Sequence, residues 1–188
     1  MQGGGGDTAA LRIFGPIGAN KSGMATRFVA VIALLALTCL PSRAFDQPRI
    51  DLVRVVKSER ILELRSGGTV VRRYGIALGG NPVGHKLRAG DERTPEGRYV
   101  LDWRNPDSGY YRSIHLTYPN AVDRAAAAVA GFDPGGMIMI HGQPNGYGWW
   151  GWLLQRFDWT NGCIAVTDED MAELWAMLRN GTPIEIIP

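Results

Sequence analysis

The sequence predicts a mainly β domain, of the β-sandwich or barrel-like kind, with about two short helices. Short runs of alternating or β-branched residues recur from residue 50 onwards, and clusters rich in glycine, proline, asparagine and aspartate separate them. Only two segments have the composition of a helix, and they do not alternate with the strands as a βαβ arrangement requires. The 188 residues are enough for one compact core but not for two.

The first 44 residues carry the pattern of an export signal. Residues 24–27 are a short basic start, residues 28–40 are almost entirely apolar, and Ser42 and Ala44 are the small residues that a signal peptidase recognises. We expect residues 24–44 to be a signal peptide, with an uncleaved anchor as the alternative. The apolar run is shorter than the about 20 residues of a membrane span, so we expect no stable span after signal cleavage.

The remaining domain boundaries follow from this signal. Residues 1–23 are rich in glycine and have no amphipathic period, and we expect them to be an extension ahead of the true start at Met24. Residues 45–188 are then the folded domain.

The first half of this domain is predicted to consist of strands. A turn signal at Ser66-Gly67-Gly68 joins two alternating runs into a hairpin, and a polar, glycine-rich loop follows at 79–95. A breaker cluster at 105–109 separates the next two strands. The expected strands are residues 50–57, 60–65, 69–78, 97–103 and 111–118.

The second half holds both predicted helices. The first is the alanine-rich segment 121–130, with Asn120 as its N-cap. The second runs from Asp168 to Arg179, with Thr167 as N-cap and acidic residues in the first turn. Short strands are expected at 136–140, 163–166 and 183–187, and a loop with one helical turn at 146–159.

Composition and charge limit the classes of function. Beyond residue 44 the chain carries 16 basic and 17 acidic residues with no basic cluster, which argues against nucleic acid as a partner. That part of the chain holds one cysteine, Cys163, which cannot form an internal disulfide. A lone thiol in an exported protein is a liability unless it is buried or used.

Two short segments have the residues for nucleophilic catalysis. His141 follows an apolar strand and precedes Gly142, and Cys163 ends the segment 160–163 (Thr-Asn-Gly-Cys). An imidazole that accepts the proton of a thiol activates it as a nucleophile. We therefore predict Cys163 as the nucleophile and His141 as its base, with a thiol pKa below the free value of about 8.5. The alternative is structural: a small buried thiol and a hydrogen-bonded histidine.

The glycines beside these residues fit the same chemistry. Gly162 lets a substrate carbonyl approach the backbone, and the N–H groups of Asn161, Gly162 and Cys163 can turn toward a developing oxyanion. A backbone carbonyl near Gly142 would hold the imidazole tautomer.

These segments resemble the L,D-transpeptidase (YkuD) catalytic domain family. That family carries His-Gly on one strand and then Ser/Thr-His-Gly-Cys around the nucleophile. Upstream it has Gly-Asp-x-x-Thr-Pro-Glu-Gly-x-Tyr, which is intact here as residues 90–99. The three motifs occur in the family's order, and the resemblance covers residues 50–188.

The resemblance implies a mainly β fold and a cysteine that attacks a peptide bond of a peptidoglycan stem peptide, after diaminopimelate. A thioester acyl-enzyme then passes to an amine. It implies Cys163 as nucleophile, His141 as base, Gly142 as donor of the orienting carbonyl, and Asn161 and Gly162 as the frame of the oxyanion site. No cofactor is expected, the location is the periplasm or cell envelope, and a wall-attached protein would be a further partner.

Two positions depart from the family pattern. Asn161 replaces the histidine two residues before the cysteine, and Ala165 replaces the common arginine two residues after it, which removes an anchor for a substrate carboxylate. With Asp158 and Trp159, these departures resemble the YafK-type branch of the family, which includes a hydrolytic release of a lipoprotein from peptidoglycan. Three functions therefore stay open: a transpeptidase, a thiol hydrolase (carboxypeptidase, endopeptidase or protein release) on the same bonds, and a non-catalytic wall-binding module.

Three further features have a structural and a functional interpretation. His85 and His115 lack the spacing of a metal site with His141, and no metal is expected. Residues 94–97 (Thr-Pro-Glu-Gly) are better explained as a turn than as a substrate-side loop. Four tryptophans, Trp149, Trp150, Trp152 and Trp159, form either core or an aromatic lid.

Overall fold

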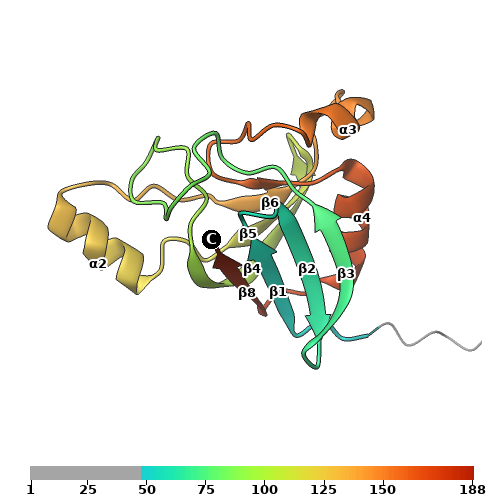
Figure 1. Ribbon diagram of the computed structural model, residues 1–188, viewed down its shortest axis with the longest axis horizontal. Helices are drawn as coiled ribbons and strands as arrows, with labels where there is room; N and C mark the ends of the chain where they lie inside the picture. The colour runs from blue at the N-terminus through green and yellow to red at the C-terminus, as the bar shows by residue number, and fades with distance from the viewer. Residues whose placement is uncertain (1–47) are drawn as a thin grey trace, which may run out of the picture. The chain divides into compact units, whose positions relative to one another are not determined.

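A computed structural model describes residues 48–188 (Figure 1). The expected extension at 1–23 and the expected signal peptide at 24–44 lie outside these residues. Within 48–188, no helix has both the length and the apolar character needed to cross a bilayer.

The structure confirms the mainly β fold. Eight strands form one mixed sheet in the order β3-β2-β1-β8-β4-β5-β6-β7. The helical elements are short: α2, the 3-10 turn η1, α3 and α4. Their bounds are Ala121–Ala130, Gly148–Trp150, Gly151–Leu154 and Asp168–Met177. The strands are β1 (Leu52–Val56), β2 (Ile61–Ser66), β3 (Thr69–Gly75), β4 (Gly97–Ser108), β5 (Tyr111–Leu116), β6 (Met139–His141), β7 (Ile164–Ala165) and β8 (Thr182–Ile187).

The last strand lies in the middle of the sheet. β8 pairs in parallel with β1, where Val53 lies opposite Ile184, and antiparallel with β4, where Tyr99 lies opposite the same residue. Figure 1 shows β8 between these two strands. It therefore joins a β3-β2-β1 half to a β4-β5-β6-β7 half.

The chain after β3 bonds to the far edge strand. The N–H of Ala77 donates to the carbonyl of Ala165, and the N–H of Ala165 donates back to Ala77, both at 2.9 Å. Thr160 N–H also donates to the Leu78 carbonyl at 3.1 Å. The edge at β7 is thereby covered, in agreement with the barrel-like alternative of the predicted fold.

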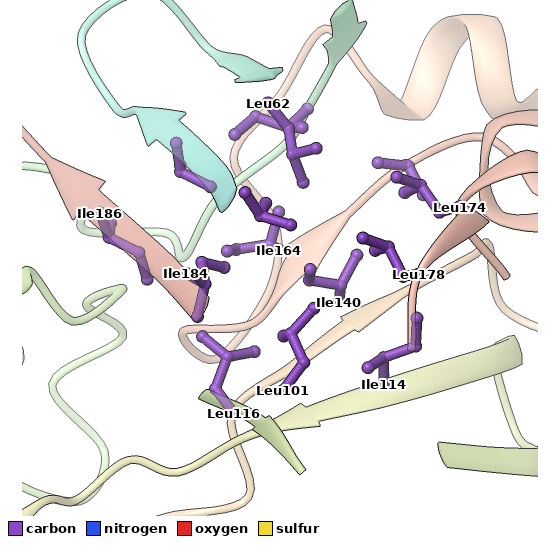
Figure 2. Packing of buried hydrophobic residues seen from close by; sticks show 14 of the residues in the cluster. Leu62, Leu101, Ile114, Leu116, Ile140, Ile164, Leu174, Leu178, Ile184 and Ile186 are labelled. Atoms are coloured by element: carbon purple, nitrogen blue, oxygen red, sulfur yellow. The ribbon is translucent and has the colours of Figure 1, made fainter. Parts of the chain in front are cut away.

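Aliphatic side chains of the sheet and of α4 make one core (Figure 2). Ile140 and Ile164, from the neighbouring strands β6 and β7, have no exposed surface, and Leu174 of α4 belongs to the same cluster. Burying each such side chain contributes about 1.5–3 kcal/mol. The core thus fixes the two strands that lead into the predicted catalytic residues.

The predicted helix caps are confirmed. The Asn120 side chain accepts from the N–H groups of Val122 and Asp123, and the Asp123 carboxylate accepts from the Asn120 N–H, a capping box. The Thr167 hydroxyl accepts from the Asp170 N–H at 3.1 Å. The second helix ends at Met177, two residues before the predicted end.

The prediction that residues 105–109 separate two strands is wrong for residues 105–108, which belong to β4. β4 continues through Asn105 and Pro106 to Ser108, and its register with β5 shifts twice, between Leu101 and Arg104 and between Asn105 and Ser108. The irregular register lets β4 include Pro106, which has no N–H to donate to a neighbouring strand. The strand expected at 136–140 is also different: the observed strand, β6, is Met139–His141.

Candidate active site

A cavity of about 260 Å³ lies where β5, β6 and the segment before β7 meet. It contains both residues predicted to carry the chemistry, His141 and Cys163, together with Asn161. Its other lining residues are Ser108, Tyr110, Ser113, Met137, Met139, Trp159 and Thr160.

The pairing of β6 with β7 puts the nucleophile and the base on one face. Ile140 lies opposite Ile164, and both point into the core. Because side chains alternate along a strand, His141 and Cys163 point away from that core. The two side chains therefore lie diagonally across neighbouring strands and reach the same cavity.

The imidazole is held by the backbone of the next residue. Nδ1 of His141 lies 2.7 Å from the Gly142 carbonyl oxygen, and the histidine is only 5% exposed. A carbonyl only accepts hydrogen bonds, so Nδ1 carries the proton and Nε2 is left as the basic nitrogen. This is the contact expected of Gly142; its catalytic role stays a prediction.

Gly142 is fixed in turn by its neighbours. Its N–H is shared between the carbonyls of Tyr110, at 3.1 Å, and Arg112, at 3.2 Å. A Cβ at this position would lie 2.6 Å from Asp168 Oδ1 and 2.9 Å from Tyr111 Cβ. The site therefore needs glycine here, for close packing rather than for an unusual φ.

Thr160 organises the nucleophile loop, residues 160–163. Its hydroxyl donates to the Cys163 carbonyl at 2.7 Å and accepts from the Gly162 N–H at 3.1 Å. The Gly162 N–H is thus engaged within the loop. The oxyanion role expected of residues 161–163 stays a prediction, with the N–H groups of Asn161 and Cys163 as its candidates. Thr160 was part of the quoted motif, but its side-chain role was not predicted.

Gly162 serves instead as a point of close approach. Its φ is +121°, and a Cβ there would lie 2.6 Å from the Arg93 carbonyl oxygen. The neighbouring Thr94 has no exposed surface, and its hydroxyl accepts from the Gly79 N–H at 3.2 Å. Residues 93 and 94 therefore pack against the nucleophile loop. This supports the interpretation of residues 94–97 as a structural turn rather than a substrate-side loop.

Aromatic rings enclose the imidazole. The Tyr110 ring lies 4.6 Å from that of His141, and the Trp159 ring lies 5.8 Å away in an edge arrangement. Tyr110 was missed because it stands in a turn with no motif. The other three tryptophans of the dense segment, Trp149, Trp150 and Trp152, are exposed, so the core interpretation is wrong for them.

Burial sets the charge of Cys163 and His141. Burial raises the pKa of the Cys163 thiol, and a backbone hydrogen bond and the charge of Lys86 only partly offset it. Burial also lowers the pKa of His141, against the opposing effect of the Gly142 bond. The expectation of a depressed thiol pKa is therefore wrong: at neutral pH both groups are uncharged. The Sγ lies 3.7 Å from the Met137 carbonyl, as suits a protonated thiol.

A hydroxyl without a partner lies next to the imidazole. Ser113 stands opposite His141 in the β5–β6 register and is 1% exposed. Its Oγ has no hydrogen-bond partner within the described residues, yet the residue lines the cavity. A buried polar group of this kind is costly unless a bound molecule satisfies it.

The other histidines lie in separate surroundings. His85 accepts from the Glu96 N–H at 3.0 Å, and His115 lies 2.7 Å from Asp102. Over residues 48–188, no group of three or more histidine, cysteine, aspartate or glutamate side chains is placed to hold a metal ion.

Comparison with known proteins gives consistent matches. Residues 50–186 match the L,D-transpeptidase catalytic domain (YkuD). "Putative L,D-transpeptidase YafK" of Escherichia coli K12 is 38% identical over 97 residues, covering 48% of this chain but only 37% of the relative. Two solved structures have a similar fold. Each match covers 74% of this chain and 48% of the chain in the solved structure. They are the helical cell shape determining protein Pgp2 of Campylobacter jejuni (28% identity, TM-score 0.55) and Bd1075 of Bdellovibrio bacteriovorus (25%, 0.50).

The family match covers well over half of the chain and includes both segments that meet in the cavity. The chain therefore belongs to the L,D-transpeptidase (YkuD) catalytic domain family.

Proposed function

We propose that this protein transfers acyl groups of peptidoglycan stem peptides through a thioester on Cys163. The observation that carries the proposal is the shared cavity: the Sγ of Cys163 and the imidazole of His141 reach it from adjacent strands, and the Gly142 carbonyl leaves Nε2 free to take a proton. Family membership supports the substrate class, and the neutral state of both groups suits a base that acts during attack.

Each bond change has a group to assist it. As Sγ attacks the carbonyl carbon of the bond after diaminopimelate, Nε2 of His141 takes the thiol proton, and backbone donors at Asn161 and Cys163 face the oxyanion. The C–N bond then breaks, and the imidazolium gives its proton to the leaving amine. In the second half, His141 takes a proton from the incoming nucleophile as this nucleophile bonds to the thioester carbon. The C–S bond then breaks, and the imidazolium returns the proton to the departing thiolate.

The incoming nucleophile decides between the two enzymatic functions. An amine gives a cross-link or an attached protein, and water gives hydrolysis. The partnerless Ser113 hydroxyl beside His141 supports the hydrolase as second candidate, because it could hold the attacking water at the base. Either activity would place the protein in the periplasm, and the name of Pgp2 supports a role in cell shape.

Mass spectrometry of muropeptides incubated with the purified protein tests the proposal. We expect trimmed, exchanged or cross-linked stem peptides with the wild type and none with Cys163→Ala. That variant should keep its fold, since replacing one partly buried Sγ by hydrogen removes little packing. Cys163→Ala activity within tenfold of the wild type would exclude Cys163 as the nucleophile. Addition of a D-amino acid separates the outcomes, since a transpeptidase incorporates it and a hydrolase does not.

A further inference from the structure

A second and larger cavity, of about 440 Å³, adjoins the back of the nucleophile loop. It is built mainly from the segment 81–93, and Phe132 from the loop after α2 covers part of it. Its lining residues are Asn81, Leu87, Arg88, Gly90, Asp91, Glu92, Arg93 and Phe132. None of them lines the cavity that holds Cys163 and His141.

The wall of this second cavity is rigid. The Asp91 carboxylate accepts from the N–H groups of Leu87, at 2.7 Å, Arg88, at 3.1 Å, and Arg93, at 3.1 Å. It also pairs with the buried ammonium of Lys86 at 2.8 Å. The Asp91 carboxylate thus fixes the backbone of residues 87–93, and the ammonium of Lys86 neutralises its charge. The backbone that carries both arginines is therefore held in place before any ligand arrives.

The arginines bring positive charge that this wall does not neutralise. Neither Arg88 nor Arg93 forms an ion pair with any residue from 48 to 188, and Nε of Arg93 is buried with no hydrogen-bond partner. The Arg88 guanidinium lies over the Phe132 ring, 5.4 Å from its centre. Two acidic residues also line the cavity, and one of them, Asp91, is paired with Lys86. Among the described residues, Glu92 is then the one lining acid without an ion pair. The two arginines outweigh it, and the cavity carries a net positive charge.

This cavity is coupled to the nucleophile through the backbone. The Arg93 carbonyl is packed against Gly162, the residue before Cys163. The charge of Lys86 reaches the thiol as well and lowers its pKa.

We propose that Arg93, assisted by Arg88, binds a carboxylate of the stem peptide while its scissile bond lies at Cys163. The inference rests on the proposed function and adds the substrate group that the second cavity recognises. The Arg93 guanidinium offers the carboxylate planar N–H groups that can form two parallel hydrogen bonds. Asn81 and the Phe132 ring complete a cradle for the peptide backbone beside it.

Direct binding to a Cys163→Ala protein tests the inference without relying on turnover. The ligand is a synthetic diaminopimelate-containing stem tetrapeptide, in its free form and with single carboxylates converted to carboxamides, measured by calorimetry. Arg93→Gln should weaken binding of the free peptide by about tenfold or more, as expected for loss of a charge-assisted hydrogen bond. Arg93→Lys should recover part of that loss. Arg72→Gln, which removes an exposed arginine paired with Glu173, is the matched control and should bind like its parent.

The amidated peptides supply the decisive comparison. One carboxamide form should bind weakly to the parent protein and be insensitive to Arg93→Gln, because the partner of the guanidinium is gone. Equal binding of the free peptide to the parent and Arg93→Gln would overturn the inference while leaving the proposed function standing. Failure of the parent to bind any form, together with unchanged muropeptides, would overturn both. Circular dichroism checks the fold of each variant, and Arg88→Gln repeats the test with a more exposed residue.

Discussion

Cys163 and His141 lie in a cavity that removes both groups from bulk water, and this decides their charges in the resting protein. Burial disfavours the thiolate and the imidazolium alike, so the pKa of the thiol rises and that of the imidazole falls. The sequence pointed to both residues as candidates for the chemistry, but it did not predict the directions in which their pKa values shift. A motif names the neighbours of a residue along the chain, whereas a pKa depends on the solvent that the fold excludes.

The first residue-scale prediction concerns the reactivity of the thiol. Alkylation of Cys163 by iodoacetamide should rise only at a pH above the ordinary thiol range, because burial raises the pKa of this thiol. His141→Ala should shift the profile little, since no imidazolium stabilises the thiolate in the resting state. A plateau near neutrality that disappears in His141→Ala would instead reveal a preformed ion pair.

The second residue-scale prediction concerns Gly142. Alanine there would place a Cβ 2.6 Å from the Asp168 carboxylate and 2.9 Å from Tyr111. We expect a loss of about 1–3 kcal/mol in the free energy of unfolding. We also expect turnover to fall by on the order of 100-fold, as the carbonyl that holds His141 moves.

The matched control for this variant is Gly75→Ala in β3. A Cβ at Gly75 would meet nothing within 4 Å. Urea unfolding and muropeptide turnover should therefore stay close to the wild type in the control. Gly142→Ala with wild-type turnover would show that the carbonyl does not orient the base.

At the scale of single elements, local rules predicted the ends of helices better than the extent of strands. Asn120 and Thr167 satisfy N–H groups two or three residues away, and such short-range bonds are visible in sequence. β4 ran through an expected break at Asn105 and Pro106, because its partner β5 accommodates the shift in register. Strand bounds depend on a neighbour that is distant in sequence, which local patterns do not contain.

An element-scale prediction follows from the loop built around Asp91. Burial raises the pKa of this carboxyl, but the Lys86 bond and three backbone N–H groups outweigh burial and bring it to about 2. The folded pKa lies below the unfolded value of 3.8, so the stabilisation is complete above pH 3.8 and is lost as the pH falls through about 2. Asp91→Asn should therefore lower the free energy of unfolding by about 2 kcal/mol at neutral pH.

The pH dependence separates this effect from general damage to the loop. Between about pH 4 and 2, the stability of the wild type should fall toward that of Asp91→Asn, so that the two urea midpoints converge. Asp107→Asn, an exposed carboxylate outside this loop, should track the wild type throughout. Midpoints that keep a constant separation down to pH 2 would contradict the assigned role of the carboxylate.

For the whole molecule, the sequence predicted the fold class but not the strand order. Each strand from residue 52 to 116 had a local signal, yet nothing in the segment 182–187 indicated that it lies between β1 and β4. Placing β8 there requires pairing across more than 130 residues, as in the Arg54–Glu185 ion pair at 2.8 Å. The same holds for the active site, where Tyr110 and Ser113 meet His141 only through the β5–β6 pairing.

The central place of β8 predicts that the two halves of the sheet unfold together. Ile184 is 1% exposed and contacts both halves, so Ile184→Ala should lower the free energy of unfolding by about 2–5 kcal/mol. Far-UV circular dichroism and tryptophan fluorescence should report one coincident transition in urea. Val83→Ala, at a position 79% exposed, is the control and should change stability by less than about 0.5 kcal/mol. Two separate transitions would show that the halves are independent.

The position of β8 also orders events during biosynthesis. A ribosome produces β8 after every other strand of the sheet, so in a nascent chain no strand joins β1 to β4 until residues 182–187 emerge. The strands that carry His141 and Cys163 then lack the neighbour that connects β4 to β1. An unfinished chain would carry His141 and Cys163 without the completed sheet around them. Synthesis of the last strand thus sets the moment at which the cavity that holds both residues can form.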